Sequence, residues 1–145
     1  MLAESSKTKN PPDRQQSPAY TQNMSANTTY QPKRHAQIIE VRAGQLAEYK
    51  KLHDAVWPDV LRQIKRSNIR NYSIFLRPWP DGKFYLFSYF EYIGSDFAAD
   101  MAAMAADRRT QEWWALCKPC QQPLPDVDIG NGGWWADTEE VFHVD

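Results

Sequence analysis

The sequence predicts an α+β protein in which an antiparallel sheet carries helices on one face, the ferredoxin-like arrangement. Two helix-like stretches separate the first strand-like stretch from the second, and a turn signal joins the second to a third. Two more helix-like stretches follow, and the chain ends on a β-rich run. The resulting order, β-α-α-β-β-α-α-β, is that of a split β-α-β unit.

The first strand and two helices are expected between residues 35 and 67. Residues 35–41 (HAQIIEV) form a short β-rich run. Residues 44–56 contain good helix formers, with Tyr49 and His53 in a stripe at helical spacing. The Trp57-Pro58 pair should break this helix, because proline has no N–H to donate. A second short helix should then cover residues 59–67.

A hairpin is predicted next. The alternation along residues 69–76 places Tyr72 on the same face as Ile74 and Leu76. Pro80-Asp81-Gly82 is a turn signal, since proline presets φ and glycine accepts a positive φ. Residues 83–92 (KFYLFSYFEY) should be the returning strand, and a strand that is aromatic on both faces is expected to be central.

The last third of the chain should hold two helices, a long loop and a closing strand. Residues 96–106 are rich in alanine and methionine, and residues 110–116 form a second short helical stretch. Residues 117–137 hold the excess of proline and glycine and are predicted to be a long ordered loop. Residues 138–145 (TEEVFHVD) are predicted to be the final strand.

The chain divides into a tail and one domain. Its 145 residues leave room for one ordinary domain. Residues 1–34 are rich in Ser, Thr, Asn, Gln and Pro and lack apolar periodicity, so they cannot bury enough surface to offset the entropy of ordering. We expect a disordered tail over residues 1–34 and a folded domain over residues 35–145.

Composition excludes several classes of partner. Seventeen Lys and Arg oppose eighteen Asp and Glu, which gives no electrostatic reason to expect nucleic acid or an anionic membrane surface. No run approaches the roughly 18 apolar residues of a membrane-spanning helix. Two cysteines cannot form a disulfide scaffold, which favours a reducing compartment such as the cytoplasm.

The predicted sheet also implies a partner copy. Helices on one face of a single sheet leave the other face uncovered, and a strand as aromatic as residues 83–92 would expose large rings to water there. A symmetric homodimer that buries this face is therefore expected.

Tyr49 and His53 are the first candidates for chemistry. Their i, i+4 spacing places both side chains on one helical face. The ordinary pKa of histidine, about 6.5, suits proton transfer near neutrality, and a neighbouring phenol can orient a hydroxylated substrate. The same spacing is typical of a core stripe that contains a hydrogen-bonded histidine, so spacing alone leaves both interpretations open.

Trp113 and Trp114 form a second feature. Adjacent helical residues diverge by about 100°, so one indole could be buried in the core while the other is half exposed. Alternatively, an indole could form the wall on which the C–H face of a sugar packs. Cys117 and Cys120 match a C-x-x-C pattern, but no second cysteine pair or βαβ context accompanies them, which disfavours a redox or metal role. No nucleotide or metalloprotease motif is present, so neither cofactor nor metal is expected.

Taken together, these motifs resemble the L-rhamnose mutarotase family. The resemblance runs from about residue 35 to residue 145 and lies in joint spacing: EYKKLHDAVWPDV, then NYSIF, an aromatic strand, QEWWAL and a terminal EEVFHVD. It implies a dimeric α/β barrel of the ferredoxin-like type that holds a monosaccharide. The chain departs from the shorter bacterial pattern in its tail, in a longer hairpin with Pro78-Trp79-Pro80 and in an insertion at residues 128–135.

The resemblance also implies roles for individual residues. The family's proton-donor histidine falls on His53, and its substrate-binding residues fall on Tyr49, Tyr72, Trp113 and Trp114. The reaction would be interconversion of the α and β anomers of L-rhamnose or a related 6-deoxy sugar by acid–base ring opening, without a cofactor.

Several points stay open at the sequence level. The complementary base is unassigned, with Asp107, Glu91 or a water held by Tyr72 as candidates. The identity of the sugar is also open. Alternative functions are a cofactor-free monooxygenase or heme-handling protein of the same architecture, or a non-catalytic sugar-binding module.

Overall fold

The computed structural model describes residues 31–145, so the tail predicted over residues 1–34 falls, up to residue 30, outside the described residues. The first strand begins two residues before the predicted boundary. In chain order the elements are β1 (Lys33–Val41), α1 (Leu46–Asp54), α2 (Pro58–Arg66), β2 (Ile69–Pro78), β3 (Phe84–Tyr92), α3 (Phe97–Ala106), α4 (Arg108–Cys117), η1 (Lys118–Cys120), β4 (Gln121–Gln122), η2 (Ile129–Asn131) and β5 (Ala136–Asp137).

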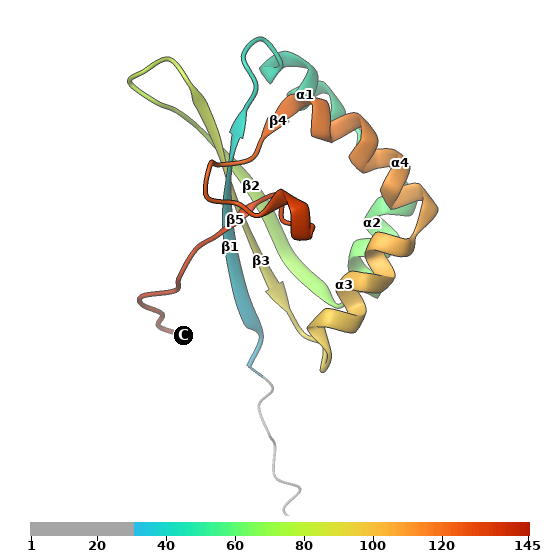
Figure 1. Cartoon of the computed structure of the whole chain (residues 1–145). Helices are drawn as coiled ribbons and strands as arrows, with labels where there is room; N and C mark the ends of the chain where they lie inside the picture. The colour runs from blue at the N-terminus through green and yellow to red at the C-terminus, as the bar shows by residue number, and fades with distance from the viewer. Residues whose placement is uncertain (1–30) are drawn as a thin grey trace, which may run out of the picture.

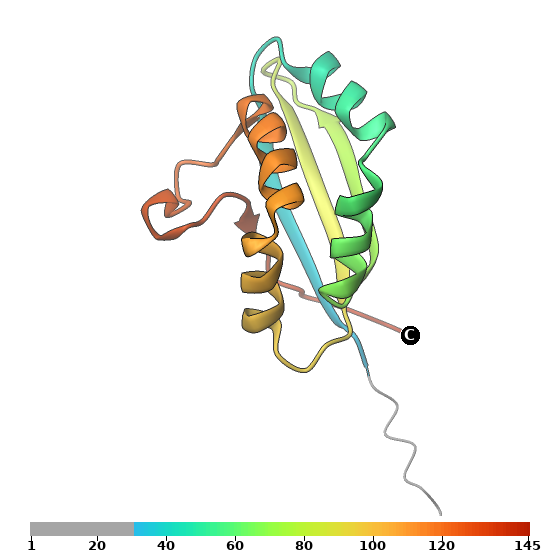
Figure 2. The same ribbon diagram turned by 90° about the vertical axis from the view of Figure 1, so that its right-hand side faces the viewer.

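The elements build an antiparallel sheet with helices on one face, which confirms the predicted α+β class. The strand order is β2-β3-β1-β4, and the short β5 also pairs with β1. All four helices lie on the same side of the sheet (Figure 1). Figure 2 shows α1 and α2 along one side of this face and α3 and α4 along the other. Residues of both helix pairs and of the sheet line the cavity described below.

The central position of β3 follows from its sequence. It pairs with β1 on one side and β2 on the other. Leu86, Ser88, Phe90 and Tyr92 alternate as buried residues facing the helices, while the residues between them are half-buried on the outer face of the sheet. The preceding turn closes as predicted, with Gly82 at φ 85° and its N–H donating to the Trp79 carbonyl.

A bulge in β2 determines which of its side chains face the helices. The pairing register shifts between Arg70 and Ser73, where Asn71 takes a left-handed φ of 49°. An extra residue in one strand moves its following side chains to the other face. As a result, both Ile69 and Tyr72 reach the helix side although three positions separate them.

The boundaries of the helices have local causes. Trp57 is extended and Pro58 starts α2, where its missing N–H leaves no hydrogen bond unmade. The Asp107 carboxylate caps α4 by accepting from the Thr110 backbone N–H at 2.8 Å. The Trp57-Pro58 break was predicted, and α4 begins two residues earlier than expected.

The predicted closing strand over residues 138–145 is wrong. The last strand of the described chain is the two-residue β5, Ala136–Asp137, which pairs with β1 and lies within the predicted loop. That loop also contains η1, β4 and η2, and β4 pairs with β1 as well. Thr138 still bonds to the Ala36 carbonyl, after which the chain leaves the sheet. The alternating pattern suggested a strand, but residues 139–145 form no strand pairing with the described residues, and their apolar side chains are exposed. Glu140 contacts β1 only through its side chain, which forms an ion pair with Arg34.

Candidate active site

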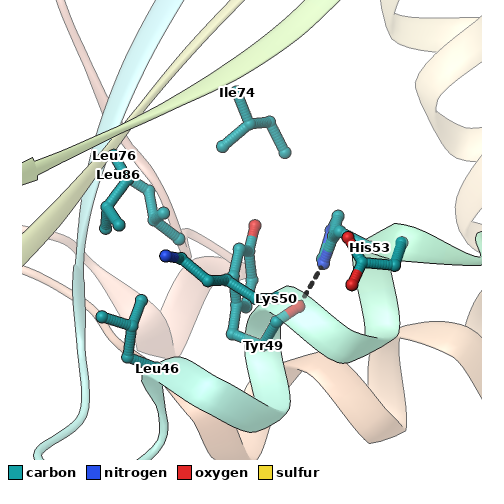
Figure 3. A pocket seen from close by; sticks show the side chains of 8 residues that line it. Leu46, Tyr49, Lys50, His53, Ile74, Leu76 and Leu86 are labelled. Atoms are coloured by element: carbon teal, nitrogen blue, oxygen red, sulfur yellow. Dashed lines mark hydrogen bonds between the residues drawn. The ribbon is translucent and has the colours of Figure 1, made fainter.

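A cavity of about 830 Å³ lies between the sheet and the helices. All five residues predicted for the site line it, from three different elements: Tyr49 and His53 on α1, Tyr72 on β2, and Trp113 and Trp114 on α4. A second hollow of about 360 Å³ is lined by α1 and the sheet and shares Tyr49, His53 and Ile74 with the cavity (Figure 3). The structure therefore brings the predicted residues together around one space.

The histidine is oriented by its own helix. His53 Nδ1 lies 3.0 Å from the Tyr49 carbonyl oxygen, a contact drawn as the dashed line in Figure 3. Because a carbonyl only accepts, Nδ1 must carry the proton, and Nε2 is left for chemistry. The Tyr49 and His53 rings stack with centroids 4.1 Å apart. Burial lowers the pKa of His53, and the bond to the Tyr49 carbonyl opposes this in part.

The paired tryptophans occupy different parts of the cavity wall. Trp113 is 5% exposed and meets His53 edge to face at 5.6 Å. It also contacts Trp57, whose other partner is the Arg109 guanidinium at 4.2 Å from the ring centroid. Trp114 packs against a different hydrophobic cluster, formed by Ile69, Phe90 and Met104. The divergence expected of neighbouring helical residues is present, yet both indoles line the same cavity.

Tyr72 approaches from the sheet. Its ring meets Phe90 edge to face at 5.6 Å. Although 43% of its surface is accessible, Tyr72 lines the cavity, and desolvation raises the pKa of its hydroxyl. Burial also raises the pKa of Tyr49, so both phenols stay neutral and can donate or accept hydrogen bonds near neutral pH.

The two carboxylates considered as bases do not line the cavity. Asp107 caps α4, accepting from both the backbone N–H and the hydroxyl of Thr110. Glu91 points to the outer face of the sheet, where it accepts from Tyr89 and Asn71. Of the three candidate bases, a water at Tyr72 is the one compatible with this geometry.

Several cavity residues were missed by sequence reasoning. Lys118, Gln121 and Asp137 line the cavity, and so does Trp134. Trp134 was noticeable only as a tryptophan within a loop, and nothing in the sequence distinguished Gln121. Their positions depend on the β4 pairing with β1, which spans about 80 residues of chain and has no local signal.

The cysteines lie beside the site as free thiols. Cys117 and Cys120 are both buried, and burial raises the pKa of the Cys117 thiol to about 12. A thiol with so high a pKa is a poor nucleophile. Among residues 31–145 the structure contains no group of three or more His, Cys, Asp or Glu side chains that could hold a metal ion, and no helix in this part of the chain has the length and apolarity to cross a membrane.

Removal of the Tyr49 hydroxyl is expected not to lower the free energy of unfolding. This hydroxyl is buried without a hydrogen bond of normal geometry to the described residues, although the Gln121 side chain lies close enough to lower its pKa against the larger effect of burial. Tyr49→Phe should therefore leave the free energy of unfolding unchanged or raise it by up to about 1 kcal/mol. Tyr92→Phe is the matched control, because it removes a 2.6 Å hydrogen bond to Asp100 and should cost about 1 kcal/mol. Urea unfolding measures both, and a large loss in Tyr49→Phe would contradict the assignment.

Comparison with known proteins gives one consistent result. The family model described as L-rhamnose mutarotase matches residues 34–144. An L-rhamnose mutarotase from Opitutus terrae is 32% identical over 112 residues, covering 77% of this chain and 98% of its own. One from Oceanobacillus iheyensis is 31% identical over 113 residues, covering 78% and 99%. The crystal structure of an L-rhamnose mutarotase from Formosa agariphila superimposes with a TM-score of 0.57 at 26% identity, over 78% of this chain and 99% of that one.

Proposed function

Since this chain belongs to the L-rhamnose mutarotase family, we propose that it is an isomerase that interconverts the α and β anomers of L-rhamnose. The observation that carries the proposal is the convergence of His53 with Tyr49, Tyr72 and two tryptophans on one cavity. The matched family and the relatives reported above are all described as L-rhamnose mutarotases. That description does not favour a monooxygenase, a heme-handling protein or a non-catalytic sugar-binding module. We propose residues 35–145 as the catalytic domain.

We assign the acid step to His53. In ring opening, the proton on His53 Nε2 passes to the ring oxygen, and the bond between that oxygen and the anomeric carbon breaks. The anomeric hydroxyl loses its proton as the aldehyde forms, and a water held by the Tyr72 hydroxyl accepts it. Rotation about the C1–C2 bond and reclosure, with both proton transfers reversed, yields the other anomer.

The remaining site residues hold the sugar. Tyr49 and Tyr72, both neutral, can donate to or accept from sugar hydroxyls. Trp113 and Trp114 supply an apolar wall for the C–H face of the ring and for the 6-methyl group. Ring opening changes no oxidation state, and the group that leaves the anomeric carbon is the ring oxygen that His53 protonates, so acid–base groups and positioning suffice for it.

We further propose that the protein acts in the cytoplasm as a homodimer formed through the outer face of the sheet. Two buried free thiols suit a reducing compartment. On the outer face Phe75 is 61% exposed. The C-terminal residues leave the sheet on the side opposite the helices (Figure 1), with Phe142 80% exposed. Exposed apolar surface of this kind is typical of an interface, and a two-fold axis would bury both copies of it at once.

Replacing His53 tests the catalytic assignment. His53→Asn removes the acid while keeping a polar side chain, so kcat/KM for anomer exchange should fall by about 10²–10⁴-fold. The measurement is saturation-transfer NMR on L-rhamnose, with L-fucose, L-lyxose and D-glucose alongside. His143→Asn, at the exposed C-terminus, is the matched control and should retain exchange. A fully active His53→Asn protein would contradict the assignment of His53 as the acid.

The pH profile tests the protonation state. An acid catalyst works in its protonated form, and burial holds the pKa of His53 below its ordinary 6.5. After subtraction of the spontaneous reaction, kcat/KM should be highest on the acid side and fall as pH rises through a pKa below 6.5. An enzymatic rate that instead rises through this range would mean that neutral His53 is the active form.

The oligomeric state tests the interface. Light scattering after size exclusion should give twice the 16.8 kDa chain mass for the wild type. Phe75→Asp, on the outer face, should shift the protein to monomer. Leu116→Asp is the matched control on α4, since Leu116 is 45% exposed and lies on the helix side. A monomeric wild type, or a dimeric Phe75→Asp protein, would contradict the proposed interface.

A further inference from the structure

One wall of the cavity is formed by a side-chain cluster that the mechanism above does not use. The Trp134 indole N–H donates to Gln121 Oε1 at 2.8 Å. Lys118 Nζ lies over the same indole, 5.1 Å from the ring centroid. All three residues line the cavity together with Tyr49 and His53. Trp134 is thus held at its edge by Gln121 and at its face by Lys118.

This arrangement fixes the orientation of the Gln121 amide. An indole N–H can only donate, so the carbonyl end of the amide must face Trp134. The NH₂ end is therefore directed away from Trp134. Gln121 is 5% exposed, and its backbone is held in β4 against Val41 of β1. Gln121 and Tyr49 line the same cavity, and with the amide oxygen on Trp134 the amide donor is left for the tyrosine side of that cavity. The Gln121 side chain is close enough to the Tyr49 hydroxyl to lower its pKa in part.

The loop that carries Trp134 is built to hold one conformation. Asp128 accepts from the backbone and side chain of Asn131, and its carbonyl accepts from Gly133 N–H. Gly132 has φ 87°, and a Cβ at Gly133 would lie 2.8 Å from the Asp128 carbonyl oxygen. Neither position accepts a side chain without strain. The segment lies within residues 128–135, where the family resemblance predicts an insertion relative to the shorter bacterial pattern.

We propose that Gln121, oriented by Trp134, is a specificity-determining residue of the sugar site. Its Nε2 donates a hydrogen bond to one ring hydroxyl of the aldopyranose on the Tyr49 side, and the Trp134 ring closes that side of the pocket. The inference rests on the proposed mutarotase function and deepens it. Neither residue takes part in the proton transfers, so both act on substrate binding.

The test compares kinetic constants of variants in the exchange assay. Gln121→Leu removes the donor and should raise KM for L-rhamnose about tenfold, the worth of one well-placed hydrogen bond, with kcat within about twofold of wild type. Trp134→Phe keeps a ring but frees the amide to turn, and should raise KM about threefold. Trp79→Phe, in the hairpin and in contact with Tyr85, is the matched control and should change neither constant.

Monodeoxy sugars separate recognition from a structural effect. The wild type should lose about tenfold in kcat/KM on one of the 2-, 3- and 4-deoxy derivatives of L-rhamnose, and Gln121→Leu should lose nothing further on that sugar. If the loss in kcat/KM from Gln121→Leu adds to the loss from the missing hydroxyl for all three derivatives, the proposal is overturned. If Gln121→Leu fails to fold, Trp134→Phe carries the same test, because its smaller penalty should vanish on the same derivative.

The outcomes distinguish this inference from the function it rests on. A wild-type protein without exchange on L-rhamnose or its derivatives overturns both. Exchange in the wild type with unchanged KM in Gln121→Leu and Trp134→Phe overturns the role of Gln121 alone. A fall in kcat at constant KM would mean that the cluster acts on the catalytic step instead, which also contradicts it.

Discussion

The hydrogen bond between His53 Nδ1 and the Tyr49 carbonyl oxygen is the contact on which the site depends. It fixes the tautomer of the imidazole, leaves Nε2 free and holds the ring against Tyr49 without help from a distant side chain. Because both partners lie on one turn of α1, the geometry survives movement of the helix as a unit. The edge contact with Trp113 then limits where the ring can go. The proposed proton donor is thus positioned by a helix and a single indole.

The cavity exists because the two helix pairs lie along the sides of a single sheet face. Its walls are aromatic, and a buried Tyr49 hydroxyl is left without a well-formed hydrogen bond. Such a group lowers stability in the absence of a ligand. A sugar supplies several hydroxyls and an apolar face, so it can satisfy the phenol while packing on the indoles. An aromatic lining and a buried phenol that can take a further hydrogen bond are the features of this cavity that suit a monosaccharide.

Local signals in the sequence predicted most of the fold and singled out four of the five candidate side chains at the cavity, while Tyr72 was assigned through the family resemblance. The spacing of Tyr49 and His53 needs only the helical period, and the Trp57-Pro58 break needs only the chemistry of proline. Glu91 is adjacent to the buried Tyr92 in β3, so alternation places it on the outer face of the sheet. The same reasoning applied to the sequence would have excluded Glu91 as the base. The final strand was mispredicted because an alternating pattern does not show whether another strand is available to pair with. Phe142 pairs with no strand among the described residues. The Gln121 and Trp134 contact joins β4 to a loop 13 residues later, and no periodic pattern reports such a contact.

The proposed mechanism requires His53 to face the ring oxygen of the bound sugar. A crystal structure of the complex with L-rhamnose would locate the sugar atoms relative to both imidazole nitrogens. We expect the ring oxygen about 2.6–3.2 Å from His53 Nε2, with Nδ1 still on the Tyr49 carbonyl and the apolar face of the sugar on the tryptophans. A sugar bound outside this cavity, or one whose ring oxygen lies beyond reach of Nε2, would contradict the proposed mechanism.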